Sequence, residues 1–244
     1  MTYLLAQALE TNRTDSFFLV IVAFMFLIFL FRAGLAYPRY KRSIYPHLYE
    51  NYLVDYFYKM NVFMDPSKSG LMKKLVGYHR LVYANLTDKE GKLCAQIVTL
   101  IHGKGLLSLA YINTSGKLSG SDQGSWYVSR NEDGKEKRYK IENPGPYLKE
   151  YLKHLAQVSE NKKVDSAIAV NDSCDISDVK SAFRIIPYSK IEETVKASDC
   201  GYGLNEAEID ALFEKLGGKI DHKEDNISKE ENTQVLFFSF TLRC

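Results

Sequence analysis

The sequence has few cysteines and little net charge, and each shortage argues against a class of protein. Cys94, Cys174, Cys200 and Cys244 lie far apart and form no C-x-x-C pair, so they lack the spacing of a zinc site. A chain of 244 residues with 45% hydrophobic residues buries a sizeable core without disulfides. We therefore predict free, mostly buried thiols. A formal net charge of +2 is too small to direct the whole molecule toward nucleic acid.

Motifs of familiar enzyme classes are also missing. The sequence contains no Walker A, G-x-G-x-x-G, G-x-S-x-G or H-E-x-x-H pattern. Its histidines are isolated in sequence, which favours surface or packed core side chains over metal ligands or catalytic bases. They are His47, His79, His102, His154 and His222. We predict no cofactor and no metal.

One long apolar segment is present. Every side chain from Phe17 to Phe31 is apolar, and Ala33 to Ala36 continue the segment beyond Arg32. A helix of about 20 such residues spans a hydrocarbon core of about 30 Å. We predict a transmembrane helix at 17–36, preceded by a short leader at 1–16. A signal peptide is disfavoured because the leader lacks a basic region.

Basic residues gather on one side of this segment. The leader carries only Arg13, whereas Arg32, Arg39, Lys41 and Arg42 lie at the other end. Because basic flanks are retained in the cytoplasm, we predict a single-pass protein of the cell membrane. We expect the N-terminus outside and the C-terminal domain in the cytoplasm. In this orientation the cysteine thiols of the domain are in a reducing compartment.

The region 43–64 predicts a juxtamembrane helix, with Leu48, Tyr52, Tyr56 and Met60 at helical spacing. Its apolar stripe suits packing on its own domain, self-association or binding to the lipid surface, and the sequence leaves these open. A protein partner or a second copy could therefore bind through this helix and the transmembrane helix.

The remaining pattern predicts a mixed α/β domain. Strands are expected at 81–86, 93–102, 106–112, 126–129, 138–141, 166–170 and 182–186, and helices at 71–77, 147–158, 188–197 and 205–216. Asp133-Gly134 is a typical hairpin turn, and Asn205 with Glu208 predicts a capped helix. Residues 218–244 read as a charged linker followed by an apolar run that forms an edge strand or a docking segment.

The run from Gly105 to Asn113, followed by SGKLSG at 115–120 and by Trp126, resembles the nuclease-related domain (NERD) family. Members read G-[IV]-F-V-I-E-T-K-N, then a G-K-I-x-G loop, then a tryptophan. Gln96-Ile97-Val98 and Asn143-Pro144 extend the match, which covers residues 69–217. The resemblance implies a PD-(D/E)xK nuclease-like, three-layer α/β domain. The alternative is a generic α/β domain with a coincidental loop.

The resemblance fails at the residues that carry the chemistry. Family members use an Asp, an E-x-K pair, a Glu in the first helix and a Gln, and the carboxylates hold Mg²⁺. The matching residues, in that order, are Val98, Ala110 with Ile112, Leu71 and Tyr147. None supplies a carboxylate or an amine. The resemblance thus implies an inactive nuclease-like domain that binds a partner, and we expect these five side chains to line one closed, dry space.

Two other functions are consistent with the sequence. Asp88, Asp122 or Glu142 could act as migrated acids in a divergent Mg²⁺-dependent nuclease, although moving a metal site requires near-octahedral ligands at about 2.0–2.1 Å. The protein could alternatively be a structural subunit of a larger membrane complex built around its N-terminal helices.

Basic residues around the predicted hairpin suggest contact with a nucleic-acid backbone, with stacking on Tyr127 or Tyr139. These basic residues are Lys117, Arg130, Lys137, Arg138 and Lys140. A solvated hairpin is the competing interpretation, because Glu132, Asp133 and Glu136 balance the charge.

Overall fold

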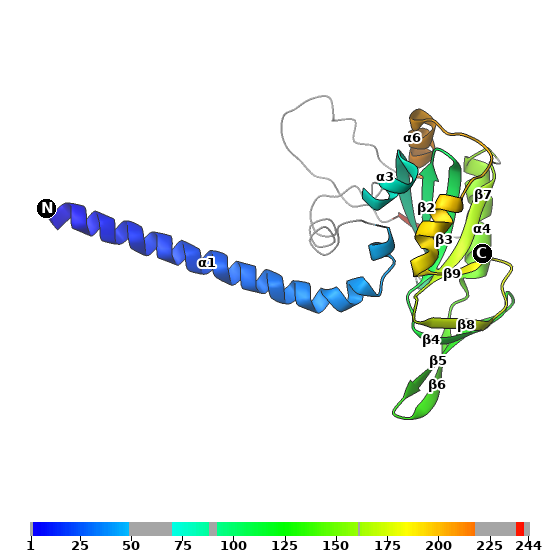
Figure 1. Ribbon diagram of the computed structural model, residues 1–244, viewed down its shortest axis with the longest axis horizontal. Coiled ribbons are helices and arrows are strands. Elements are labelled where there is room, and N and C mark those ends of the chain that lie inside the picture. The colour runs from blue at the N-terminus through cyan, green and yellow to red at the C-terminus, as the bar shows by residue number, and fades with distance from the viewer. Residues whose placement is uncertain (1, 49–69, 88–91, 161, 218–237, 242–244) are drawn as a thin grey trace. The chain divides into compact units, whose positions relative to one another are not determined.

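The computed structural model describes residues 2–48, 70–87, 92–160, 162–217 and 238–241 (Figure 1). The chain divides into two units, from Met1 to Lys41 and from Arg42 to Cys244. The first unit is one helix, and the second contains two mixed β-sheets and the remaining helices. The predicted mixed α/β class is confirmed.

Helix α1 runs from Thr2 to Lys41 and is longer than the predicted span at 17–36. It continues through the predicted leader because residues 2–16 contain neither glycine nor proline to end it. Within the part of the chain that the structure describes, its segment Phe18–Leu35 alone is long and apolar enough to cross a membrane. Side chains from 18 to 31 are all exposed, which suits a lipid environment.

The larger sheet has the strand order β10-β1-β2-β3-β7-β9. Its strands are β1 (His79–Thr87), β2 (Leu93–His102), β3 (Gly105–Ile112), β7 (Val164–Val170), β9 (Ile185–Pro187) and β10 (Phe238–Thr241). β1, β2 and β3 are antiparallel neighbours, whereas β3–β7, β7–β9 and β1–β10 are parallel pairs. The described part of the C-terminal run, Phe238–Thr241, is thus an edge strand, one of the two alternatives expected for it.

Helices cover both faces of this sheet, because its strands are apolar at successive positions and bury side chains on each side. On one face, called the α4 face, pack α4 (Pro144–Val158) and α6 (Glu206–Lys215), with Leu155 and Phe213 in the core. On the other, called the α3 face, pack α3 (Gly70–Val76) and α5 (Ile191–Ala197), with Met72 and Val195. Residues Ile44 and Leu48 join the α3 face.

The smaller sheet has the order β6-β5-β4-β8. Its strands are β4 (Gly116–Gly120), β5 (Trp126–Glu132), β6 (Lys135–Ile141) and β8 (Cys174–Val179). Leu118, Trp126 and Val128 point into the core of the α4 face. The β5–β6 hairpin projects beyond the larger sheet (Figure 1). Neither β4 nor β8 was expected, since each is short and polar at alternate positions.

Most predicted elements are present with shifted ends. The capping box of α6 is confirmed, because Asn205 Oδ1 accepts from Glu208 N and Glu208 Oε2 accepts from Asn205 N. The strand expected at 182–186 is wrong at its start: Ala182 N donates to the Asp122 carboxylate, and β9 begins only at Ile185. Of the helix expected at 43–64, the described part holds a 3-10 turn at Tyr45–His47, and residues 49–64 lie outside the described residues.

Candidate functional site

The glycines shared with NERD lie where the backbone requires them. Gly116 has φ +114°, and a Cβ there would lie 2.4 Å from the Ser129 carbonyl oxygen. Gly120 has φ +153°, and a Cβ would lie 2.5 Å from the Trp126 ring. Gly105 has φ +132° and packs against Cys200. These positions exclude other side chains for steric reasons, so they build the scaffold.

Trp126 and Asn143 hold the loop between β4 and β5. The Trp126 ring is fully buried, and its Nε1 donates to the Ser121 carbonyl at 3.0 Å. Asn143 caps α4 by accepting from Gly145 N, while its Nδ2 donates to the carbonyls of Ser121, Asp122 and Gly124. The Asn-Pro pair therefore joins the start of α4 to this loop.

Of the five positions that match catalytic residues, two are buried in the core and three are half-buried against it. Ala110 and Val98 are 0% and 2% exposed. Ala110 belongs to the α4 face, where Ile112 and Tyr147 pack against the same cluster. Val98 belongs to the α3 face, where Leu71 packs. No carboxylate or ammonium group occupies any of these sites.

The expectation that these five side chains line one space is wrong. Ile97 pairs with Ala110 and Val98 with Leu109, so Val98 points away from Ala110 across the sheet. The residues of β2 that share the face of Ala110 include Ile97 and Thr99. Neither is acidic, and indeed β2 and β3 contain no Asp, Glu or Lys at any position.

Buried hydroxyl groups near this position satisfy one another. Thr99 Oγ1 lies 2.9 Å from Ser108 Oγ and 3.1 Å from the Tyr151 hydroxyl. Burial raises the pKa of Tyr151, so the phenol stays neutral. A neutral, internally bonded trio stabilises the contact of α4 with the sheet and offers no negative ligand to a cation.

The acids considered as migrated ligands are engaged elsewhere. Both carboxylate oxygens of Asp122 accept from Ala182 N at 2.8 Å, and Glu142 pairs with Lys92 at 2.9 Å. Asp88 lies outside the described residues. Across residues 70–87, 92–160 and 162–217, no three His, Cys, Asp or Glu side chains lie in an arrangement that could hold a metal ion.

A polar junction that sequence reasoning missed lies at the ends of β3 and β7. Asn171 Nδ2 donates to the Arg42 carbonyl at 2.8 Å and to Asn113 Oδ1 at 3.3 Å. His47 Nε2 lies 4.0 Å from Asp172 Oδ2. Burial lowers the pKa of His47 more than Asp172 raises it. The junction joins the first residue after α1 to the carboxyl ends of two parallel strands.

A signal for this junction was present in the sequence. Asn113 follows one predicted strand and Asn171 follows another. Parallel strands end at the same edge of a sheet, so a parallel pairing of β3 and β7 brings the two amides together. The contact with Arg42 has no such signal.

Two buried histidines lie at the other end of the strands from this junction. His79 and His102 are cross-strand partners on β1 and β2 and are 5% and 1% exposed. Burial lowers the pKa of His102 to about 4, with smaller contributions from His79 and Lys104. Because His102 Nδ1 accepts from Lys104 N, its buried Nε2 is the protonated nitrogen and has no described hydrogen-bond partner.

No known family or fold identifies this arrangement. No protein-family model matches the chain, and no curated protein or solved structure matches it. The resemblance to NERD therefore stays a prediction.

The basic residues predicted for nucleic-acid contact divide between the two faces of the smaller sheet. Lys117 and Arg138 are the cross-strand neighbours of Ser129, on the outer face of the sheet, which points away from the core. Arg130 and Lys137 are cross-strand neighbours on the opposite face. Lys140 shares the outer face with Arg138. Lys117 pairs with Asp178 at 2.6 Å, and this hydrogen bond raises the pKa of Lys117. The five cations therefore do not form one surface.

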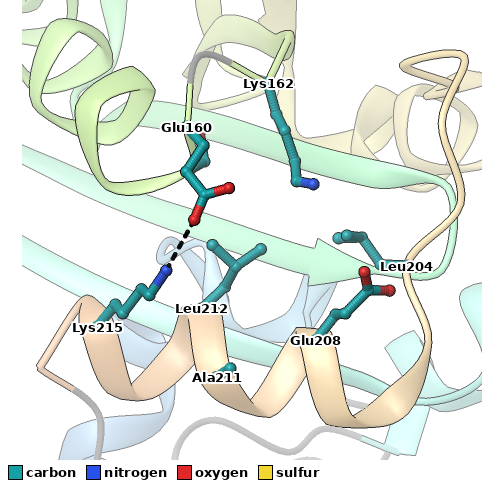
Figure 2. Close-up of a pocket in the computed structure, with 8 residues that line it drawn as sticks. Glu160, Lys162, Leu204, Glu208, Ala211, Leu212 and Lys215 are labelled. Atoms are coloured by element: carbon teal, nitrogen blue, oxygen red, sulfur yellow. Dashed lines mark hydrogen bonds and ion pairs between the residues drawn. The ribbon is translucent and has the colours of Figure 1, made fainter.

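A small pocket lies between the end of α4 and α6 (Figure 2). Its volume of about 130 Å³ is below the ~300–1,000 Å³ typical of small-molecule sites. Glu160 and Lys215 close one side with an ion pair of 3.2 Å, while Lys162 and Glu208 project at the opening. Its charges are balanced, and Glu208 is already bonded to the α6 cap.

Proposed function

We propose that this protein is a single-pass membrane protein whose α/β domain has a nuclease-like architecture without nuclease activity and serves as a binding module in the cytoplasm. One observation carries the proposal. β2 and β3, which would hold the Asp and the E-x-K pair, contain no Asp, Glu or Lys, and Ala110 is fully buried.

The physical reason is the chemistry of magnesium. Mg²⁺ requires hard oxygen ligands at about 2.0–2.1 Å, and carboxylates normally supply the protein's share. Alanine, valine and isoleucine side chains have no such atoms. The closed packing around Ala110 also leaves no room for a phosphate group. These strands therefore supply packing surface to the domain and offer no carboxylate ligand to a metal ion.

The nuclease-like architecture is supported by the residues shared with NERD. Gly116, Gly120, Trp126 and Asn143 each meet a steric or hydrogen-bonding requirement of the loops around β4 and α4. A scaffold of this kind without charged residues on β2 and β3 suits a binding role better than a metal-dependent one. The proposed partner of this module is a protein.

A cleavage assay tests the absence of activity. The full chain in detergent is incubated with DNA or RNA, with Mg²⁺ or Mn²⁺, and with or without EDTA. We expect no cleavage that EDTA abolishes. A matched variant, Asp122→Asn with Glu142→Gln, separates contamination from migrated acids: EDTA-sensitive cleavage that this variant loses would refute the proposal.

A fusion experiment tests the orientation. The basic residues Arg39, Lys41 and Arg42 favour retention of the following domain in the cytoplasm. A reporter that is active only in the cytoplasm, fused after Cys244, should therefore be functional. Activity of a reporter that works only outside the membrane would contradict the proposed orientation.

A further inference from the structure

The point at which the chain enters the second unit is linked to the β5–β6 hairpin. Arg42, the first residue after α1, accepts a hydrogen bond from Asn171, which also donates to Asn113. The next residue, Thr114, accepts at Oγ1 from Arg130 Nη2 at 2.8 Å. Within the second unit, these hydrogen bonds and the Asn113–Thr114 peptide bond therefore connect Arg42 to β5.

Charge is segregated along this hairpin. Its tip carries three acids, Glu132, Asp133 and Glu136, together with Lys135. Behind the tip lies a set of cations that we call the basic band. The basic band consists of Arg130 on β5 and Lys137, Arg138 and Lys140 on β6. Residues 126–131 and 137–141 contain no acid, and one acid of the tip reaches the band: the Glu132 carboxylate accepts from Lys137 Nζ at 3.1 Å and from the Tyr139 hydroxyl at 2.8 Å.

The basic band is accessible because β6 is the last strand of its sheet. Every residue of β6 from Lys135 to Lys140 is exposed. Lys137, Arg138 and Lys140 all lie on this edge strand, and their long side chains can extend from either face toward one partner at the sheet edge. The ion pair of Lys137 with Glu132, at 3.1 Å, is exposed and holds the lysine only weakly.

Aromatic rings accompany the cations. Tyr139 is 39% exposed, and the Arg130 guanidinium lies 5.8 Å from its ring centre. The Arg138 guanidinium lies 4.0 Å from the Tyr127 ring centre. Tyrosine beside lysine and arginine is the combination found where proteins meet the headgroup region of a bilayer.

We propose that the basic band binds the anionic phospholipid headgroups of the membrane that α1 crosses. The proposal rests on the proposed membrane anchor. The proposed anchor attaches the band to this membrane, so the headgroups are present at high effective concentration. A nucleic acid would have to be captured from solution by few cations against the acidic tip. Lipid is therefore the favoured partner.

Hydrogen–deuterium exchange of the full chain in nanodiscs tests this proposal. One disc contains phosphatidylcholine alone, and the other also contains phosphatidylserine. We expect several-fold slower exchange in the peptide covering 126–141 in the anionic disc, and loss of this difference at high salt because salt screens exposed charges.

Matched variants assign the effect to the band. Lys137→Gln, Arg138→Gln and Lys140→Gln together should remove the difference between the discs. Three exposed lysines on α4 and α5 serve as the control, neutralised as Lys149→Gln, Lys153→Gln and Lys196→Gln, and should preserve it. Both sets are compared only between discs, so intrinsic exchange rates cancel, and Trp126 fluorescence verifies folding.

Three outcomes would overturn the proposal. Equal exchange in both discs, with the chain firmly incorporated, refutes headgroup binding and leaves the anchor intact. A chain that an alkaline wash removes from the discs refutes the anchor and this proposal with it. Slower exchange on addition of single-stranded RNA or DNA to the neutral disc, without any effect of phosphatidylserine, identifies nucleic acid as the partner.

Discussion

A charge introduced at Ala110 should destabilise the second unit strongly. Ala110 is fully buried on the α4 face, between Ile97 of β2 and Ile168 of β7. A buried glutamate without a partner has a pKa raised to about 8–9 and stays neutral at pH 7. The unfolded chain ionises with a pKa of about 4.3, so the difference costs about 4 kcal/mol at pH 7. Overpacking adds about 1–3 kcal/mol.

This loss is comparable to the ~5–15 kcal/mol that stabilises a typical domain. Urea unfolding of the full chain in detergent measures it, because Trp126 is the only tryptophan and is fully buried. Ala110→Glu should lower the unfolding midpoint far more than Ile112→Glu, which is half-buried on the same strand and face. The ionisation cost should shrink to about 1 kcal/mol at pH 5, because that pH lies only about 0.7 unit above the pKa of about 4.3 of the unfolded glutamate.

Magnesium distinguishes core from metal site. Because no second carboxylate faces Ala110 from β2 or β3, Mg²⁺ should leave the midpoint of Ala110→Glu unchanged. A variant that unfolds like the parent, or that Mg²⁺ stabilises, would refute the conclusion that this position is closed core.

Three further predictions concern stability. The pKa of His102 is lowered to about 4, so acidification protonates this histidine in the unfolded chain before it does so in the folded protein. The free energy of unfolding should therefore fall by up to about 3 kcal/mol between pH 6.5 and 4. His102→Gln should reduce this dependence of stability on pH, and an unchanged dependence would contradict the role of His102. Gly105→Ala should cost about 2–4 kcal/mol, because its Cβ would lie 2.6 Å from another side chain, whereas Gly103→Ala, with 3.7 Å to the nearest atom, should be tolerated. Asn205→Ala should lower the free energy of unfolding by the ~1 kcal/mol typical of a lost helix cap, and Asn143→Ala should lower it by more, because Asn143 also bonds to the loop between β4 and β5. Equal decreases of the melting temperature would show that the bonds of Asn143 to the loop contribute nothing.

The elements that could be predicted from the sequence are those determined by residues close together in the chain. The long apolar helix follows from the run at Phe18–Leu35, and the α6 cap follows from Asn205 and Glu208. The hairpin follows from Asp133-Gly134, where both residues have positive φ. In each case the residues that decide the structure are neighbours in sequence.

Register and long-range contacts were not predictable in the same way. That Val98 and Ala110 lie on opposite faces depends on the pairing of Ile97 with Ala110, which a one-residue shift would reverse. The bond from Asn171 to Arg42 joins residues 129 apart in sequence. β8 pairs with β4 in parallel, and its alternation is too short to identify a strand from sequence.

The central claim is that the position proposed as the counterpart of a nuclease centre is apolar core. Methyl NMR of the full chain in detergent tests it directly, with labels on Val98, Ala110 and Ile112 and titration with Mn²⁺, whose unpaired electrons broaden nearby signals. We expect these three methyl groups to keep their line widths at stoichiometric Mn²⁺. Selective broadening of the Ala110 and Ile112 signals, reversed by EDTA, would place a metal at this position and contradict the account.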